Sequence, residues 1–151
     1  LELEYNLLLF KITKTRNSSS IQEKNIFMIK KSRSKFQKYF KIMNQLTLNM
    51  HKSLIKGNVK QFGDYLNESW SIKKKLNDNV SNTKIDMLNK IAIKNGALGC
   101  KLLGAGQSGY FLVYASPIYQ KKIIELFENK NLLLENFNFT NNGLEIWSTE
   151  R

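Results

Sequence analysis

The chain has 151 residues, of which 42% are hydrophobic, so it is long and apolar enough for one domain with a core and too apolar for a disordered segment. No apolar run approaches the roughly 20 residues that a membrane-spanning helix needs, and we expect no membrane partner. The single cysteine, Cys100, excludes a disulfide within the chain and favours a reducing, cytoplasmic location.

The net charge of +12 comes from one segment, because residues 11–60 hold 13 of the 24 basic residues and only one of the 12 acidic residues. A strongly basic segment is typical of nucleic-acid-binding proteins. Proteins that read bases and phosphates, however, rely on the planar fork of arginine, and the only arginines here are Arg16, Arg33 and Arg151. The lysines therefore favour a solvated helix face, and a nucleic-acid surface stays open as the alternative.

In the first half of the chain, the spacing of apolar residues predicts a strand and two helices. The apolar run of residues 5–12 indicates a buried strand, and the Ser- and Asn-rich residues 13–20 indicate a loop. A long amphipathic helix with a lysine-coated outer side follows and ends at Gly57, because apolar residues recur on one face at Phe36, Tyr39, Phe40, Met43, Leu46, Met50 and Leu54. A second helix spans about residues 59–76, with an inner face of Phe62, Leu66 and Trp70.

In the second half, turn-forming residues 77–82 precede a third helix, which Thr83 and Asp86 open as a variant of the capping box and Gly96 ends. The inner face of this helix carries Ile85, Leu88, Ile91 and Ala92. A fourth helix begins at Pro117 after a Ser116 cap, and strands are expected at residues 97–103, 110–115, 132–139 and 144–148. Together these elements predict an α+β domain with an antiparallel sheet and helices packed on one face.

Residues 104–109 read Gly-Ala-Gly-Gln-Ser-Gly, which has the spacing of the dinucleotide-binding fingerprint. That fingerprint requires a helix directly after the glycine turn, whereas residues 110–115 read as a strand. No Gly-Lys-Ser/Thr follows either, so a Walker A loop is excluded. The chemistry alone indicates a hairpin whose glycines permit positive φ or let a backbone or a phosphate come close.

The sequence of residues 95–114, NGALGCKLLGAGQSGYFLVY, resembles the C-terminal glycine-rich motif of the GHMP kinases, the superfamily of galactokinase, homoserine kinase, mevalonate kinase and phosphomevalonate kinase. The resemblance extends upstream through residues 65–99 and to residues 7–21. It looks most like the sugar kinases that phosphorylate D-glycero-D-manno-heptose 7-phosphate at the anomeric position. The distinctive string is Glu68-Ser-Trp70, Lys73-Lys74, Val80-Ser-Asn82, Ile85-Asp86 and the Gly96–Gly106 segment.

This resemblance implies a ferredoxin-like C-terminal domain of a two-domain kinase that uses ATP and Mg²⁺. The phosphate loop of such kinases, of the type Pro-x-x-x-Gly-Leu-Gly-Ser-Ser, does not occur in the chain. We therefore expect residues 1–151 to be one C-terminal domain whose partner, the N-terminal ATP-binding domain, lies outside this chain. That domain would hold most of the ATP and Mg²⁺ contacts, and this chain would contain no catalytic residue, bind no metal and be inactive alone.

The resemblance also names candidate site residues. The glycine segment would support the phosphate loop and the substrate, a sugar phosphate, through Gly104, Ala105, Gly106, Gln107, Ser108 and Gly109. Lys101 and Glu68 are candidate substrate contacts, and Lys101 as a strand residue could equally point to solvent. Similar kinases have glycines where this chain has Gln107-Ser108, which leaves open an impaired loop or a specialised substrate.

Two further interpretations remain at this stage. The chain could be a stand-alone binding module that uses the basic helix to hold an anionic partner such as nucleic acid, or a family member that has lost catalysis. His51 is expected on the surface, because a single histidine makes no metal site, and Cys100 is expected in the core, because no base is evident near it.

Overall fold

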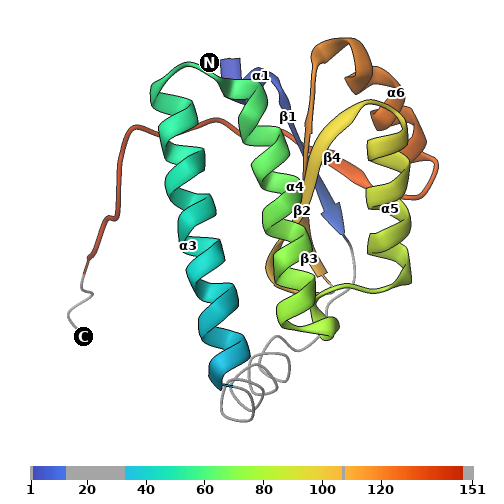
Figure 1. Cartoon of the computed structure of the whole chain (residues 1–151). Helices are drawn as coiled ribbons and strands as arrows, with labels where there is room; N and C mark the ends of the chain where they lie inside the picture. Colours follow the sequence, from blue (N-terminus) through green and yellow to red (C-terminus); the bar gives the residue numbers. More distant parts are fainter. Residues whose placement is uncertain (1, 13–32, 107, 148–151) are drawn as a thin grey trace.

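The computed structural model describes residues 2–12, 33–106 and 108–147 (Figure 1). The loop expected at residues 13–20 lies outside these ranges. In chain order the elements are α1 (Glu2–Tyr5), β1 (Leu7–Ile12), α3 (Arg33–Ile55), α4 (Val59–Leu76), the 3₁₀ turn η1 (Asp78–Val80), α5 (Thr83–Lys94), β2 (Ala97–Gly106), β3 (Ser108–Ala115), α6 (Pro117–Glu128) and β4 (Leu133–Glu135).

The strands form one four-stranded antiparallel sheet in the order β2-β3-β1-β4. Strand β3 follows β2 through a hairpin, and β1 pairs with the other side of β3, from Leu7 opposite Tyr114 to Ile12 opposite Gly109. The strand from the start of the chain is therefore buried in the middle of the sheet, which explains why residues 7–12 are almost uniformly apolar.

Helices cover both faces of this sheet. Consecutive strand residues point to opposite faces. Val113 belongs to the cluster that contains Ile85 of α5 and Phe127 of α6, whereas the next residue, Tyr114, belongs to the cluster that contains Leu66 of α4. Figure 1 accordingly shows α3 and α4 on one side and α5 and α6 on the other. The predicted α+β class with an antiparallel sheet is confirmed, whereas the prediction that the helices pack on one face only is wrong, because α3 and α4 cover the second face.

Two glycines set how closely α4 approaches the edge strand β2. A Cβ at Gly99 would collide with the carbonyl oxygen of Gly63, and a Cβ at Gly63 would lie 2.6 Å from the ring of Tyr114. Neither glycine has positive φ, so both are required for space and not for conformation. The direct backbone contact fixes the helix along the strand, and it therefore fixes which α4 side chains reach the hairpin.

The helix ends show one error in the sequence interpretation. The N-cap of α5 is Asn82, whose Oδ1 accepts from the amide of Ile85 at 3.0 Å, and not the Thr83–Asp86 pair expected. The carboxylate of Asp86 instead accepts from Ser81 and from Lys74. An Asn side chain caps as well as Thr, and the preceding residue was the better placed of the two. Ser116 and Pro117 do open α6, although the Ser116 side chain makes no capping hydrogen bond.

The long basic helix is confirmed as α3, but its apolar stripe is narrower than expected. Phe36 and Leu46 are buried, whereas Phe40 is 49% and Leu54 is 37% exposed. The reason is that α3 packs on α4 and not on the sheet, so only a narrow strip of its surface is covered. The core predictions for α4 and α5 agree with the structure for Leu66, Trp70, Ile85, Leu88 and Ala92, which are buried, whereas Phe62 and Ile91 are half-buried.

The C-terminal part differs most from expectation. Of the strand expected at residues 132–139 only Leu133–Glu135 forms, and residues 144–147 of the next form none, with Trp147 79% exposed. Strand β4 pairs with β1 up to Glu135 opposite Leu9, and β1 begins only two residues earlier, where α1 ends. The alternation of apolar residues therefore predicted more strand than the structure contains.

Candidate functional site

The glycine segment forms the tip of the β2–β3 hairpin, with Leu103 opposite Tyr110 and Gly106 opposite Ser108. The strands extend further than expected, so all of these glycines belong to strands, and the register shifts between Leu103 and Gly106. Gly109 has a φ of 119°, and a Cβ there would lie 2.5 Å from the Leu103 carbonyl oxygen. The close approach that this glycine permits is therefore to the neighbouring strand. Gln107 lies outside the described residues.

Gly104 serves a different purpose. Its φ is 107°, which a side-chain-bearing residue rarely adopts, while a Cβ there would meet nothing closer than the Ser108 carbonyl oxygen at 3.6 Å. This left-handed residue lies in the irregular part of β2, where the register with β3 shifts. The Nζ of Lys73 donates a hydrogen bond of 3.0 Å to the carbonyl oxygen of Gly104.

The reach of Lys73 follows from the glycine contact between α4 and β2. Ten residues of helix separate Gly63 from Lys73 and rise about 15 Å. Five residues of strand separate Gly99 from Gly104 and rise about 16 Å. Helix and strand therefore cover the same distance from the glycine contact to the hairpin. The last turn of α4 therefore lies beside the irregular part of β2.

Lys101 lies on β2 between these two contacts. Its neighbours Cys100 and Leu102 point into the core beneath α5 and α6, so Lys101 points to the opposite face, towards α4. Its Nζ donates to the Ser69 hydroxyl at 2.6 Å. The expectation that Lys101 could point to solvent is only partly met, because the side chain is half-buried against the helix.

Both lysines carry charge in a partly desolvated place. Burial lowers the pKa of Lys73 from its usual value. Burial, and to a lesser degree repulsion by Lys73, lowers the pKa of Lys101. The ion pairs found in the described part of the chain involve other lysines, namely Lys11 and Lys74. The edge of the sheet beside the hairpin thus presents two half-buried ammonium groups with no carboxylate partner among the described residues.

Glu68, the other candidate contact, is not part of this cluster. Its side chain is exposed, and five residues of helix turn it about 140° away from Lys73. Its role in substrate binding stays a prediction without a described contact to support it. Lys73 was named in the sequence string but not as a site residue, and only its position beyond the Gly63–Gly99 contact could have indicated one.

Other residues of the resemblance string meet at the far side of the α4 end. Lys74 pairs with Asp86 at 3.0 Å and lies 5.9 Å from the ring centre of Trp70, while Ser81 donates to the same carboxylate. Trp70 is buried in the core. This network ties the end of α4 to the start of α5, so these residues hold the fold around the site.

The remaining sequence candidates lie as expected. His51 is exposed on α3, and Cys100 is fully buried, where desolvation raises the pKa of its thiol well above the usual range. Among the described residues no group of three His, Cys, Asp or Glu side chains could hold a metal ion. In the same ranges no helix combines the length and the apolar character of a membrane span.

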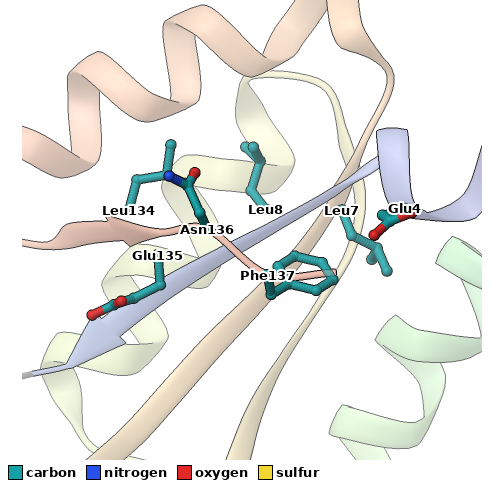
Figure 2. A pocket seen from close by; sticks show the side chains of 7 residues that line it. All are labelled: Glu4, Leu7, Leu8, Leu134, Glu135, Asn136 and Phe137. Atoms are coloured by element: carbon teal, nitrogen blue, oxygen red, sulfur yellow. The ribbon is translucent and has the colours of Figure 1, made fainter. Parts of the chain in front are cut away.

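Two hollows of the surface lie at the other end of the sheet from the hairpin. One, of about 130 Å³, is lined by Glu4, Leu7, Leu8, Leu134, Glu135, Asn136 and Phe137 (Figure 2). A second, of about 580 Å³, lies beside Gly96 and Tyr119, where β2 begins and β3 ends. The two carboxylates of the first would repel an anion. Neither of these two hollows includes a hairpin residue.

Comparison with known proteins identifies the family to which this arrangement belongs. Residues 50–130, more than half of the chain, match the family of the C-terminal domain of GHMP kinases. The chain belongs to this family. The matched segment runs from the end of α3 to the end of α6, and it includes the α4–β2 contact and the hairpin.

Individual relatives are kinases of small molecules. The chain is 27% identical over 149 residues to the D-glycero-alpha-D-manno-heptose 7-phosphate kinase of Campylobacter jejuni, which covers 97% of this chain and 42% of the relative. The L. major mevalonate kinase in complex with R-mevalonate shares its fold, with a TM-score of 0.76, 17% identity, and 85% of this chain and 40% of the kinase covered. A D-glycero-D-manno-heptose 1-phosphate kinase of Bacteroides thetaiotaomicron has a TM-score of 0.54 and 21% identity over 97% of this chain and 38% of its own.

The chain thus spans about two fifths of the length of the relatives described here. GHMP kinases use ATP and Mg²⁺. Mg²⁺ needs oxygen ligands, chiefly carboxylates, and the described residues offer no cluster of them. Phosphate needs cationic and hydrogen-bond donors, which Lys73 and Lys101 could supply. The described residues therefore fit a phosphate group and not the metal.

Proposed function

We propose that this chain is the C-terminal, substrate-side domain of an ATP-dependent sugar kinase that phosphorylates D-glycero-D-manno-heptose 7-phosphate at its anomeric hydroxyl. The observation that carries the proposal is the 27% identity to the Campylobacter jejuni heptose 7-phosphate kinase over 97% of the chain. The identity extends over all the described elements, including those outside the segment that matches the family.

The site supports a role in positioning. In phosphoryl transfer the anomeric oxygen bonds to the γ-phosphorus of ATP, the bond to the β-γ bridging oxygen breaks, ADP leaves, and the hydroxyl proton goes to a base or to water. Proteins accelerate this reaction by alignment and by stabilising charge. An N-terminal domain outside this chain would supply the ATP site. The hairpin edge with Lys73 and Lys101 would hold the sugar phosphate against that site.

The test is an assay of the full-length protein that contains this chain. ADP release is measured with heptose 7-phosphate, mevalonate and galactose as acceptors, and the product is identified by ³¹P NMR as a 1,7-bisphosphate. We expect turnover with heptose 7-phosphate and a much lower kcat/KM with the other two. The 151-residue chain alone serves as the control and should be inactive.

Two results would contradict the proposal in different ways. Turnover by the isolated chain would show that it contains a complete kinase site. Efficient phosphorylation of mevalonate or galactose, with none of heptose 7-phosphate, would keep the kinase family but overturn the substrate.

A further inference from the structure

We propose that Lys73 and Lys101 form a phosphate-binding site at the base of the glycine hairpin, and that this site takes the phosphate of the sugar substrate that is not transferred. The identity of the ligand as a sugar phosphate rests on the proposed function, whereas the affinity for a phosphate dianion rests on the two lysines alone. The ligand class is therefore a phosphomonoester whose reacting hydroxyl lies away from its phosphate.

The geometry leaves hydrogen-bond capacity for such a ligand. An ammonium group has three donors. Among the described contacts, Lys73 uses one on the Gly104 carbonyl oxygen, and Lys101 uses one on the Ser69 hydroxyl. The Ser69 oxygen accepts in that bond, so its own hydrogen remains available to donate. Donors from two adjoining elements, α4 and β2, thus lie beside the hairpin, near enough to one another for the charge of Lys73 to act on Lys101.

The electrostatics favour a doubly charged ligand. Burial lowers the pKa of Lys73, and burial together with repulsion by Lys73 lowers the pKa of Lys101. Lys74, the next residue in the chain, has a carboxylate and an aromatic ring as partners. Lys73 and Lys101 have neither in the described part of the chain, and a phosphate dianion would neutralise both at once.

The rigid support of the site is a further argument. The Gly63–Gly99 backbone contact and the regular hydrogen bonding of α4 and β2 hold both lysine backbones in place before any ligand binds. Preorganised donors bind an anion without the entropy cost of ordering a loop. An adventitious pair of surface lysines would lack such support.

The first experiment measures phosphate binding without any enzymatic reaction. Inorganic phosphate is titrated into the 151-residue chain, and the lysine side-chain signals are followed by NMR. If the 151-residue chain does not unfold cooperatively by itself, the full-length protein is used in its place. We expect the signals of Lys73 and Lys101 to shift together and their pKa values to rise in phosphate. Lys75, exposed on the same turn of α4, is the internal control and should not respond. If the signal of Lys75 shifts as much as those of Lys73 and Lys101, or if the signals of Lys73 and Lys101 do not shift, the proposed site is wrong.

The second experiment identifies which phosphate the site holds. In the full-length enzyme, Lys101→Met should raise the KM for heptose 7-phosphate roughly tenfold to hundredfold, the usual effect of losing one charge-assisted hydrogen bond, and leave the KM for ATP unchanged. Lys101→Arg should recover part of the affinity, and Lys75→Met should behave as wild type. Lys101 is preferred to Lys73 because its protein partner is a hydroxyl and not the hairpin backbone.

The outcomes separate this inference from the proposed function. A rise in the KM for ATP alone would assign the lysines to the nucleotide and overturn the inference, although the kinase could still be correct. Failure of the wild-type enzyme to use heptose 7-phosphate would overturn the proposed function, while the phosphate titration would still decide whether the anion site exists.

Discussion

Two groups of lysines in this protein differ in their burial and in their hydrogen-bond partners. Helix α3 carries exposed lysines at 35, 38, 41 and 52 and no acidic residue. The edge formed by α4 and β2 carries only two, Lys73 and Lys101, but both are half-buried and hydrogen-bonded to residues more than thirty positions away. The lysines of the first group contribute to the high net charge. The burial of Lys73 and Lys101, and their hydrogen bonds to distant residues, indicate a binding site at the second group.

The difference originates in the neighbours of each element. Helix α3 packs chiefly on α4 and turns its lysines outwards, where water solvates each charge independently. Helix α4 lies directly on β2, so polar side chains between these two elements are partly removed from water. A charge kept in such a place at a cost in solvation is a better indicator of a ligand than many charges in water.

The largest effect is expected from moving the α4–β2 contact itself. Gly99→Val places side-chain atoms where the Gly63 carbonyl lies, and overpacking of this kind destabilises by roughly 1–3 kcal/mol or more. Because the lysines depend on this contact, phosphate binding should weaken as well. Gly143→Val, at a glycine with nothing within 4 Å of a Cβ, should leave the urea midpoint nearly unchanged. Equal midpoints for the two variants would show that the close approach is not needed.

The network of Lys74, Asp86 and Ser81 should contribute less to the free energy of unfolding than the α4–β2 contact does. Asp86→Asn removes the ion pair with Lys74 and weakens the hydrogen bond from Ser81, and since both are partly exposed we expect a loss of about 1 kcal/mol in the free energy of unfolding. Glu135→Gln, which breaks the more exposed 3.9 Å pair with Lys11, should cost less than about 0.5 kcal/mol. A larger loss at Glu135 would reverse the assigned order of the two pairs.

The pH dependence of stability should distinguish the buried lysines from the exposed ones. The folded pKa of Lys73 and of Lys101 lies below the usual 10.5, so between the lowered value and 10.5 the unfolded chain binds more protons than the folded one. Stability from this source rises with pH through that window and is lost as pH falls below it. Lys101→Met should flatten this rise in urea titrations between pH 8 and about 10.5. An unchanged slope would mean that Lys101 titrates as an exposed lysine.

The smallest effect is expected on α3. The triple variant Lys35→Gln, Lys38→Gln, Lys41→Gln should change the free energy of unfolding by no more than about 0.5 kcal/mol, since each side chain is exposed. The KM for heptose 7-phosphate should stay as in the wild type. Salt-dependent binding of the wild-type chain to nucleic acid that the triple variant abolishes would instead support the alternative of a stand-alone binding module.

Much of the fold could be predicted from the sequence because its causes are local. The apolar run of residues 5–12, the helical spacing around Leu66 and Trp70, and the glycine-rich turn between two strands each act over a few residues, and each predicted the right kind of element. The first strand nevertheless begins at Leu7 and not at Tyr5, which belongs to α1. The family could also be inferred, because the ordered string from Glu68 to Gly106 specifies both a hairpin and the α4–α5 junction that supports it.

Other features needed the tertiary structure, since they depend on what lies beside each segment. The residues beyond Glu135 have a strand-like pattern but form no strand in the described part of the chain. Lys101 could have pointed to water, and Lys73 was one lysine of three in a row. The contact of Gly63 with Gly99 lets α4 lie directly on the edge strand, and a residue spacing along one chain cannot specify which two backbones come that close.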